Sequence, residues 1–443
     1  MIRTFPAILG LEGPEASVAT STPWNQSAAA GVAGPETAPQ PVAEKERIVS
    51  IDALRGFALL GILYMNIQAF SMVSAAYMNP TAYGDLHGAN YAVWLAGHLL
   101  ADLKFMSIFS MLFGAGIFLM TSHIEASGQR PTRLHYRRMG WLMLFGRLHG
   151  SLLWYGDILY DYALCGMLVY LFRKRRPRTL IITGIILFSV APLLLYGYGY
   201  GYAQMSAHEQ QLERQGMWQP TAEQIAKQNA VYRGGWLTQM SERLPETGRM
   251  KTVYFLAFSF WREVMLIGIA LFKLGVFGAK SPTWVYSTMI ALGGLVGVPV
   301  IYYAVYREVV SGWAFPYSFV NGQQYNYWAS ILVSFAWVGA VMLACRSTLL
   351  LPLTRRLAAV GRMAFSNYIF HSLVCTTVFY GHGFGLFGKV ERVGQLAMVL
   401  AIWAFQLVVS PVWLRYFLFG PLEWLWRSLT YLQWEPFRRP ASA

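Results

Sequence analysis

The chain has 443 residues, of which 56% are hydrophobic, 16% are aromatic and only 13% are charged. Soluble domains carry about 25% charged residues, so this composition excludes an ordinary soluble enzyme and favours a protein embedded in a lipid bilayer. The formal net charge of +14 does not indicate a nucleic-acid partner, because lysine and arginine lie mostly in short loops between apolar runs, where membrane topology and anionic lipid explain them.

Residues 1–45 are rich in alanine, proline, glycine, serine and threonine and show no hydrophobic periodicity. Such a segment buries little apolar surface, so we expect it to be disordered. It lacks a basic start followed by an apolar core and therefore does not read as a secretory signal. We expect residues 46–432 to form a multi-pass transmembrane domain and residues 433–443 a short tail.

Apolar runs of helical length predict an all-α fold, a polytopic membrane helix bundle with about ten transmembrane helices. The expected spans lie at about 53–74, 94–120, 136–154, 156–172, 179–200, 252–277, 283–306, 323–345, 357–380 and 396–414. The loops after the second, fourth, sixth and eighth spans carry most of the cations, so the positive-inside rule places both termini in the cytoplasm. The polar, mixed-charge segment 204–250 is then extracytoplasmic, and we expect it to form amphipathic helices.

His149 and Asp157 are the principal candidate catalytic residues. Both lie in nearly uncharged sequence, where an ionisable side chain costs roughly 2.5–3.5 kcal/mol unless it faces a cavity or a partner. The turn Trp154-Tyr155-Gly156 should fold two helices back on each other and bring His149 and Asp157 together, with His149 roughly 7–8 Å below the outer rim. His149 would then act as a general base whose tautomer Asp157 fixes. A hydrogen-bonded core histidine is the alternative.

Further polar residues fall in the outer half of the same bundle. Asn66 and Lys104 are candidate substrate-binding residues, and either side chain would stabilise an oxyanion next to His149. A structural ion pair, such as Lys104 with Asp102, is the alternative interpretation. Asp161, the adjacent Arg262-Glu263 and the weaker candidate His371, for which packing is the simpler explanation, complete this set.

A second polar group lies on the predicted cytoplasmic side and consists of Asp52, Arg55, Arg362, Glu423 and Arg427. Helix capping and contact with lipid headgroups would explain these residues. The functional alternative is a basic mouth that binds an anionic, phosphate-bearing ligand, for which arginine is well suited.

Several familiar catalytic patterns do not occur in this sequence. It has no His-Glu-x-x-His, Cys-x-x-Cys, Gly-x-Ser-x-Gly or P-loop motif. Cys165, Cys345 and Cys375 lie inside apolar segments and are expected to be buried thiols. We therefore predict no metal site and no tightly bound cofactor.

Several ordered motifs resemble those of the YeiB-like bacterial membrane proteins. They are Arg47-Ile-Val-Ser-Ile-Asp52-Ala-Leu-Arg55-Gly56 with Asn66, Lys104-Phe105 with Phe113-Gly-Ala-Gly116, His149-Gly150 with Gly156-Asp157, and Gly361-Arg362-Met363 with Asn367-Tyr368 and Gly420-Pro-Leu-Glu423-Trp-Leu-Trp-Arg427. The closing motifs resemble that family's C-terminal domain of unknown function 418, over about residues 270–432. His371 departs from the family pattern, which usually has glutamine there.

The resemblance implies a multi-pass protein of the bacterial inner membrane, distantly grouped with transmembrane acyltransferases such as the lysosomal heparan glucosaminide acetyltransferase. Those enzymes take an acyl group from coenzyme A on the cytoplasmic side and pass it to an acceptor across the membrane. The first hypothesis is therefore transfer from acyl-CoA to a hydroxyl or amine on a small molecule, glycan or lipid. A small-molecule or lipid transporter that uses buried ionisable residues is the second, and a non-catalytic envelope assembly protein, with a partner bound at 204–250, is the third.

Overall fold

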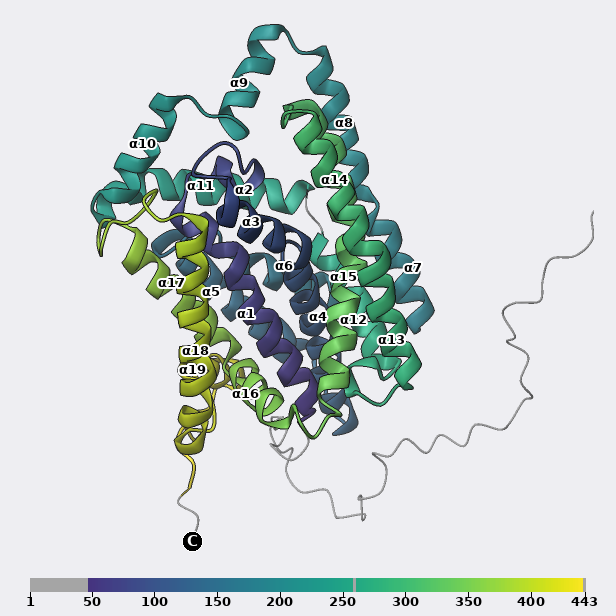
Figure 1. Cartoon of the computed structure of the whole chain (residues 1–443). Coiled ribbons are helices and arrows are strands. Elements are labelled where there is room, and N and C mark those ends of the chain that lie inside the picture. The colour runs from purple at the N-terminus through teal and green to yellow at the C-terminus, as the bar shows by residue number, and fades with distance from the viewer. Residues whose placement is uncertain (1–46, 258–259, 441–443) are drawn as a thin grey trace, which may run out of the picture. The chain divides into compact units, whose positions relative to one another are not determined.

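The computed structural model describes the backbone of residues 47–257 and 260–440, and the side chains of these residues except 249–263. Within these ranges the chain is helical and contains no strand, only an isolated bridge between Phe417 and Arg438. The all-α class is therefore confirmed (Figure 1). The expected disorder of residues 1–45 concerns a segment outside the described residues.

Among the described residues, six helical segments are long and apolar enough to cross a membrane. They are α1 (Val49–Ser71), α3 (Gly88–Leu100) with α4 (Lys104–Ala126), α7 (Pro177–Phe188) with α8 (Val190–Gln204), α13 (Thr283–Leu292) with α14 (Val298–Val310), the π-helix Tyr317–Gly322 with α15 (Gln323–Ala344), and α18 (Arg392–Tyr416). The finding supports a membrane protein but not the full set of expected spans.

The other expected spans form shorter or more polar helices. They are α5 (Thr132–Leu152), which carries several arginines, α6 (Leu159–Val169), α12 (Phe260–Lys273) and α17 (Ala364–Phe379). Each is too short or too charged to qualify as a membrane span by length and composition alone.

Two expected spans are interrupted by a residue with a non-helical backbone conformation. The predicted helix 94–120 breaks between α3 and α4, where Leu103 adopts a left-handed conformation with φ 62°, an unusual one for leucine. The predicted helix 357–380 breaks at Met363, between α16 (Leu351–Arg362) and α17. The sequence analysis did not predict these breaks, because it included the charged residues beside them, Asp102, Lys104 and Arg362, in continuous spans.

Helix α1 lies in the middle of the bundle and packs against α4, α16, α17 and α18 (Figure 1). Its contact with α16 depends on Gly56 and Gly361. A Cβ atom on Gly56 would collide with the backbone carbonyl of Leu357, and one on Gly361 with that of Asp52. The family motifs around these glycines therefore encode a close helix crossing, as small residues do in membrane proteins.

Helices α4 and α12 approach each other in the same way. Gly114 faces the backbone of Met265, and Gly268 faces the backbone of Met111. Gly116, in contrast, has no atom within 4 Å of the position that a Cβ would take. Only the first glycine of Phe113-Gly-Ala-Gly116 thus serves the helix contact that this motif predicted.

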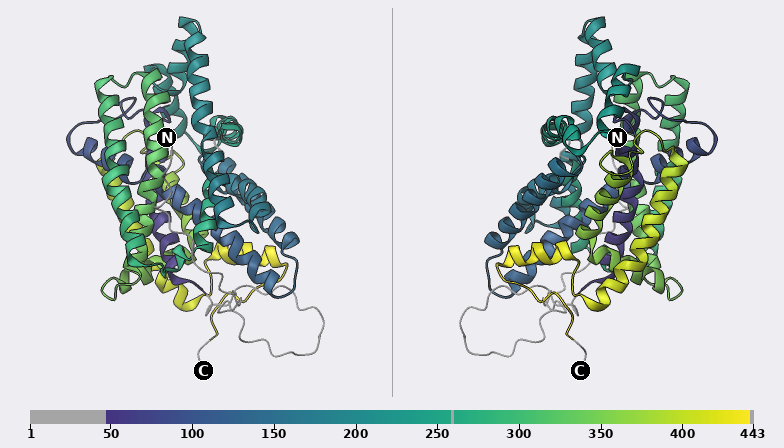
Figure 2. Two further views of the ribbon diagram at one scale, coloured as in Figure 1. Left: turned by 90° about the vertical axis from the view of Figure 1, so that its right-hand side faces the viewer. Right: turned by 90° about the vertical axis from the view of Figure 1, so that its left-hand side faces the viewer.

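Residues 204–250 form helices, as expected. Helices α9 (Ala207–Met217) and α10 (Ala222–Arg233) both begin with capping boxes, at Ser206 and Thr221. Helix α11 (Trp236–Ala257) lies across the bundle at the end that carries α9 and α10 (Figure 1). Figure 2 shows α19 (Pro421–Tyr431) lying across the opposite end, where it packs against α5.

Candidate functional site

The α5–α6 hairpin that the turn Trp154-Tyr155-Gly156 predicted is present in the structure. Two glycines of α5 make the approach possible. A Cβ on Gly146 would collide with the backbone nitrogen of Tyr160 and lie 2.8 Å from Asp157 Oδ2, and one on Gly150 would lie 3.3 Å from Asp157 Cβ. The hairpin therefore seats the Asp157 carboxylate directly against the face of α5 that carries His149.

His149 and Asp157 form a direct contact, with His149 Nδ1 2.8 Å from Asp157 Oδ1. Asp157 also accepts hydrogen bonds from the backbone N–H groups of Leu159 (3.2 Å) and Tyr160 (3.0 Å) at the start of α6. These bonds fix the carboxylate, and the positive end of the helix favours its negative charge. His149 is 3% exposed and Asp157 is 1% exposed, so water does not compete for the contact.

A third member of this cluster, Ser372, was missed by sequence reasoning. Its hydroxyl oxygen lies 2.8 Å from His149 Nε2, and the residue is 1% exposed. If Nδ1–H donates to Asp157, then Nε2 accepts the hydrogen bond from the Ser372 hydroxyl. The order hydroxyl, imidazole and carboxylate is that of a serine–histidine–aspartate triad, which is recognised by geometry rather than by sequence position.

The only sequence signal for Ser372 was its spacing on α17. It follows Tyr368 by four residues and precedes Thr376 by four, so the three polar residues share one helix face. The Tyr368 ring lies 5.2 Å from the His149 ring. However, Ser372 and His149 are 223 residues apart in sequence, and no local pattern connects such positions.

Aromatic residues and helix α11 close the site. Trp154 lies edge-on to His149, with ring centroids 6.5 Å apart, and stacks on Phe70 at 4.0 Å. Its indole Nε1–H is buried without a hydrogen-bond acceptor among the described residues, and such a donor points to a water molecule or a ligand carbonyl. Helix α11 covers the end of the hairpin, because the Thr247 hydroxyl donates to the carbonyl of Gly150 (3.0 Å) and Arg243 to that of Leu152 (2.6 Å).

Lys104, proposed from the sequence as an oxyanion donor next to His149, belongs to a different cluster. Its ammonium group donates to the carbonyl of His98 (2.7 Å) and to Asn326 Oδ1 (2.6 Å), and Asn326 Nδ2 donates to Asp102 Oδ2 (2.8 Å). Lys104 and Asp102 are therefore joined through Asn326 rather than directly. The sequence placed both charges in one region, but it gave no indication of Asn326, which comes from α15.

The remaining outer residues do not join the His149 cluster. Asn66 is half-buried on α1 and makes no side-chain hydrogen bond within the described part of the chain. Asp161 is buried on α6. The side chains of Arg262 and Glu263 lie outside the described residues. His371 Nε2–H donates a hydrogen bond to Gln406 Oε1 (2.8 Å) in the core.

The residues of the predicted cytoplasmic group have two kinds of contact: Glu423 caps a helix, and Asp52 forms ion pairs with arginines. Glu423 accepts hydrogen bonds from the N–H groups of Phe365 (2.6 Å) and Ser366 (3.1 Å) and therefore caps α17. Burial raises the pKa of this carboxyl. Asp52 binds Arg55 at 2.8 Å and Arg47 at 3.4 Å.

The arginines of this group come from different helices. Arg362 donates to the carbonyl of Leu418 (3.5 Å), and the guanidinium of Arg427 lies 4.3 Å from the ring centre of Phe419. Arg55 and Arg427 are both close enough to Arg138 of α5 to act on its charge. The ends of α1, α5 and α19 thus carry a basic cluster, which consists of Arg55, Arg138 and Arg427.

Comparison with known proteins places the chain among uncharacterised relatives. A family model described as "Protein of unknown function (DUF418)" matches residues 271–433. Uncharacterized protein YxaH of Bacillus subtilis (strain 168) is 32% identical over 429 residues, which cover 90% of this chain and 98% of the relative. Uncharacterized protein YeiB of Escherichia coli (strain K12) is 31% identical over 395 residues, which cover 87% and 96%. An uncharacterized 39.9 kDa protein in amylase 3′ region of Bacillus acidopullulyticus is 27% identical over 416 residues, which cover 88% and 96%.

These relatives match over nearly their full length, and two of them exceed 30% identity. The chain therefore belongs to the YeiB-like family, with a DUF418 domain in its C-terminal part.

Proposed function

We propose that this protein is a transmembrane acyltransferase of the bacterial inner membrane that moves an acyl group from acyl-CoA in the cytoplasm to an extracytoplasmic hydroxyl or amine. Helices α5, α6, α12 and α17 complete about ten spans, and both termini lie in the cytoplasm. The observation that carries the proposal is the buried chain of Ser372, His149 and Asp157, with both hydrogen bonds at 2.8 Å.

The chemistry follows from the positions of the protons. The Ser372 hydroxyl oxygen attacks the thioester carbonyl carbon while His149 Nε2 takes its proton. The carbon–sulfur bond then breaks, and the imidazolium returns the proton to the leaving thiolate, which leaves an acyl ester on Ser372. The acceptor hydroxyl or amine next gives its proton to His149 Nε2 and attacks the ester, and Ser372 leaves with that proton.

Asp157 and Trp154 support this sequence in different ways. The Asp157 carboxylate stabilises the imidazolium that forms in each half-reaction, because it already accepts the Nδ1–H bond. The unpaired indole N–H of Trp154 is the candidate donor to the tetrahedral oxyanion. Helix α11 covers this end of the hairpin, so its displacement would admit the acceptor from the outer side.

The basic cluster supports the cytoplasmic donor side. Coenzyme A carries phosphate groups, and the planar guanidinium group of arginine binds phosphate oxygens in pairs. Arg55, Arg138 and Arg427 bring such groups together from three helices. Glu423 contributes by capping α17, the helix that also carries Ser372.

The test is direct detection of the acyl-enzyme. Purified full-length protein in nanodiscs is incubated with acetyl-CoA or palmitoyl-CoA, quenched and digested, and the peptides are analysed by mass spectrometry. We expect an acyl ester on Ser372, with no label in Ser372→Ala or His149→Ala. Thr376→Val removes another buried hydroxyl one turn along α17, which bonds to the carbonyl of Ser372, and should keep the label. Folded wild-type protein that forms no ester with either donor would overturn the mechanism.

Proton-coupled transport is a second candidate, and the Lys104 cluster favours it. Buried ionisable groups at a helix interruption are typical of transporter substrate and ion sites, and Lys104 lies at the break between α3 and α4. Uptake into proteoliposomes without any acyl donor would support this function, and Lys104→Met should abolish that uptake.

A further inference from the structure

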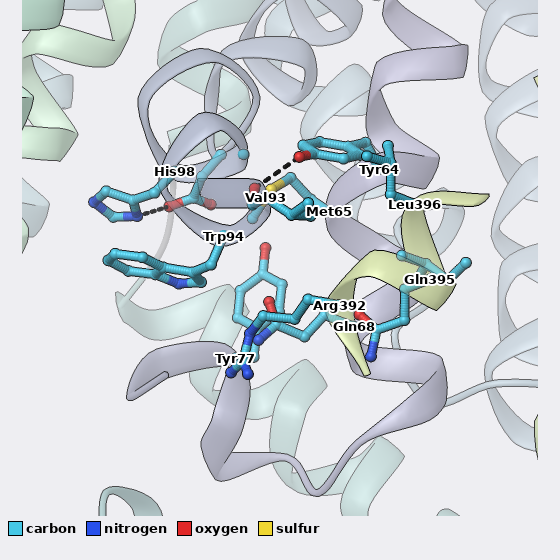
Figure 3. Close-up of a pocket in the computed structure, with 13 residues that line it drawn as sticks. Tyr64, Met65, Gln68, Tyr77, Val93, Trp94, His98, Arg392, Gln395 and Leu396 are labelled. Atoms are coloured by element: carbon cyan, nitrogen blue, oxygen red, sulfur yellow. Dashed lines mark hydrogen bonds and ion pairs between the residues drawn. The ribbon is translucent and has the colours of Figure 1, made fainter. Parts of the chain in front are cut away.

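A pocket outside the His149 cluster lies between α1, α2 (Ala75–Met78), α3 and α18 (Figure 3). It forms where α3 ends, because the chain turns at Ala101–Leu103 instead of continuing as one helix. On the α3 side, Gly97 lets the Tyr64 ring pack within 2.8 Å of the place where a Cβ would lie. The interruption of the predicted span 94–120 therefore leaves polar side chains facing a hollow.

One wall of the pocket carries His98 and Asp102, which lie one helical turn apart. His98 Nδ1 lies 3.5 Å from Asp102 Oδ2, and both side chains are 14% exposed. The His98 ring stacks on Trp94, with centroids 5.3 Å apart (Figure 3). If Nδ1–H faces Asp102, then His98 Nε2 and Asp102 Oδ1 are left as hydrogen-bond acceptors.

The negative charge of Asp102 is balanced by Lys104, which lies on the side of Asp102 away from the pocket. Asn326 joins Asp102 to the ammonium group of Lys104, which is fully buried. The carboxylate therefore has a positive partner that does not face the pocket. An additional cation would compete with Lys104, and an anion would be repelled by Asp102.

The opposite wall carries Arg392, Gln68 and Gln395 (Figure 3). Arg392 is 2% exposed and donates to the carbonyls of Asp85 (2.7 Å) and Pro80 (2.9 Å), while its Nε–H has no acceptor among the described residues. One N–H of each glutamine amide is already bound, that of Gln68 to the carbonyl of Ala76 and that of Gln395 to the carbonyl of Val390. Each glutamine therefore offers its amide oxygen and its second N–H.

We propose that this pocket, whose volume is about 40 Å³, binds the hydroxyl groups at one end of a neutral polyol such as glycerol. Its acceptors are the carboxylate of Asp102, the imidazole of His98 and two amide oxygens, and they match the O–H donors of a polyol, whose oxygens can accept from the second N–H of each glutamine. The buried Nε–H of Arg392 complements a ring or hydroxyl oxygen, and the Trp94 side chain supplies an aromatic surface. Asp102 is balanced by Lys104 through Asn326, and Arg392 is held by backbone carbonyls, so neither wall presents a charge that needs an ionic ligand.

This site is independent of the proposed acyl transfer. The end of α1 separates it from the His149 cluster: Tyr64 and Gln68 line the pocket, whereas Phe70 stacks on Trp154, which contacts His149. No residue of the pocket takes part in the steps assigned to Ser372. Ligand binding at one site and acyl-enzyme formation at the other can therefore fail separately.

The test uses purified full-length protein in nanodiscs and isothermal titration calorimetry. Glucose, N-acetylglucosamine and glycerol serve as neutral probes, and choline and inorganic phosphate as charged probes. We expect saturable binding of at least one neutral probe, weaker by about tenfold or more in Asp102→Asn, because a hydrogen bond to a charged group is lost. Neither charged probe should bind in the same range.

Two further variants keep the result interpretable. Gln395→Met removes the amide oxygen at similar volume, away from the Lys104 cluster, and should weaken binding even if Asp102→Asn fails to fold. Asp157→Asn, which lies outside the pocket, should bind the neutral probe as the wild type does. Absence of binding by every neutral probe, tighter binding of choline or phosphate, or unchanged affinity in Gln395→Met and Asp102→Asn would overturn the proposal.

Discussion

The substitution Asp157→Asn tests the His149 cluster most sharply, because it keeps the size of the side chain and removes its charge. In the wild type, Oδ1 accepts from His149 Nδ1 and Leu159 N, and Oδ2 accepts from Tyr160 N. All three donors meet acceptor oxygens. Asparagine has one acceptor oxygen and one NH2 group, so it cannot satisfy all three donors.

Either orientation of the new amide has a definite consequence. If the NH2 group faces His149, Nδ1 must become the acceptor and Nε2 must carry the proton, so that His149 can no longer take the proton of Ser372. If it faces Tyr160, a buried N–H loses its acceptor, at a cost of about 1–3 kcal/mol. Both orientations lose one backbone bond of α6, because an NH2 group that faces His149 also faces the N–H of Leu159. Both also remove the negative charge that stabilises the imidazolium, so acyl-enzyme formation should fall by roughly 1,000- to 10,000-fold.

The assay measures the rate of acyl-enzyme formation from acetyl-CoA by quenched-flow mass spectrometry, and thermal unfolding in detergent serves as a control for folding. Asp161→Asn is the matched variant, because Asp161 lies one turn further along α6 and is also buried. It should form the acyl-enzyme at the wild-type rate. A folded Asp157→Asn protein that forms the ester as fast as the wild type would show that Asp157 does not orient His149 for catalysis.

Three further predictions concern stability, measured by thermal unfolding of the purified protein. Gly361→Ala should destabilise the protein by about 1–3 kcal/mol or more, because its Cβ would meet the backbone of α1. Gly116→Ala is the control and should not destabilise the protein, because the space around Gly116 is open. Equal effects of the two substitutions would contradict the close crossing of α1 and α16. Lys104→Met should lower the free energy of unfolding by about 3–5 kcal/mol, because it leaves the Asp102 charge unbalanced. Adding Asp102→Asn should recover part of that loss. If the effects of the two substitutions simply add in the double variant, the coupling through Asn326 is refuted. Burial raises the pKa of Glu423 above the usual 4.5, so the folded protein holds this proton more tightly than the unfolded chain. The free energy of unfolding should therefore gain a contribution as the pH falls from neutral through the raised pKa, and Glu423→Gln should lack it.

Much of the His149 cluster was within reach of sequence reasoning. A histidine and a carboxylate flanked a short turn in an apolar region, and two helices that fold back across such a turn must face each other. The structure accordingly brings His149 and Asp157 into contact. Ser372 was out of reach, since it joins from a helix more than two hundred residues away, and serine is too common in membrane helices to stand out.

The pocket at the end of α3 shows a different limit. His98 and Asp102 are four residues apart, a spacing that suits a shared helix face, but the sequence analysis did not single out His98. The helix break at Leu103 was not visible in the sequence, because no proline or glycine marks it and leucine rarely adopts a positive φ. The partners Asn326 and Arg392 come from α15 and α18, so the pocket depended on tertiary packing.

The sequence by itself determined that this is an all-helical membrane protein of the YeiB-like type, since hydrophobic length and ordered local motifs depend only on neighbouring residues. It also identified the ionisable side chains that lie in apolar segments, where burying a charge costs free energy. Only the tertiary structure decided their partners. In the structure, His149 is hydrogen-bonded to Ser372, Lys104 donates to Asn326, and Glu423 caps the N-terminus of α17. The physical reason is that hydrogen bonds act over about 3 Å, and which distant helices come that close is set by side-chain packing.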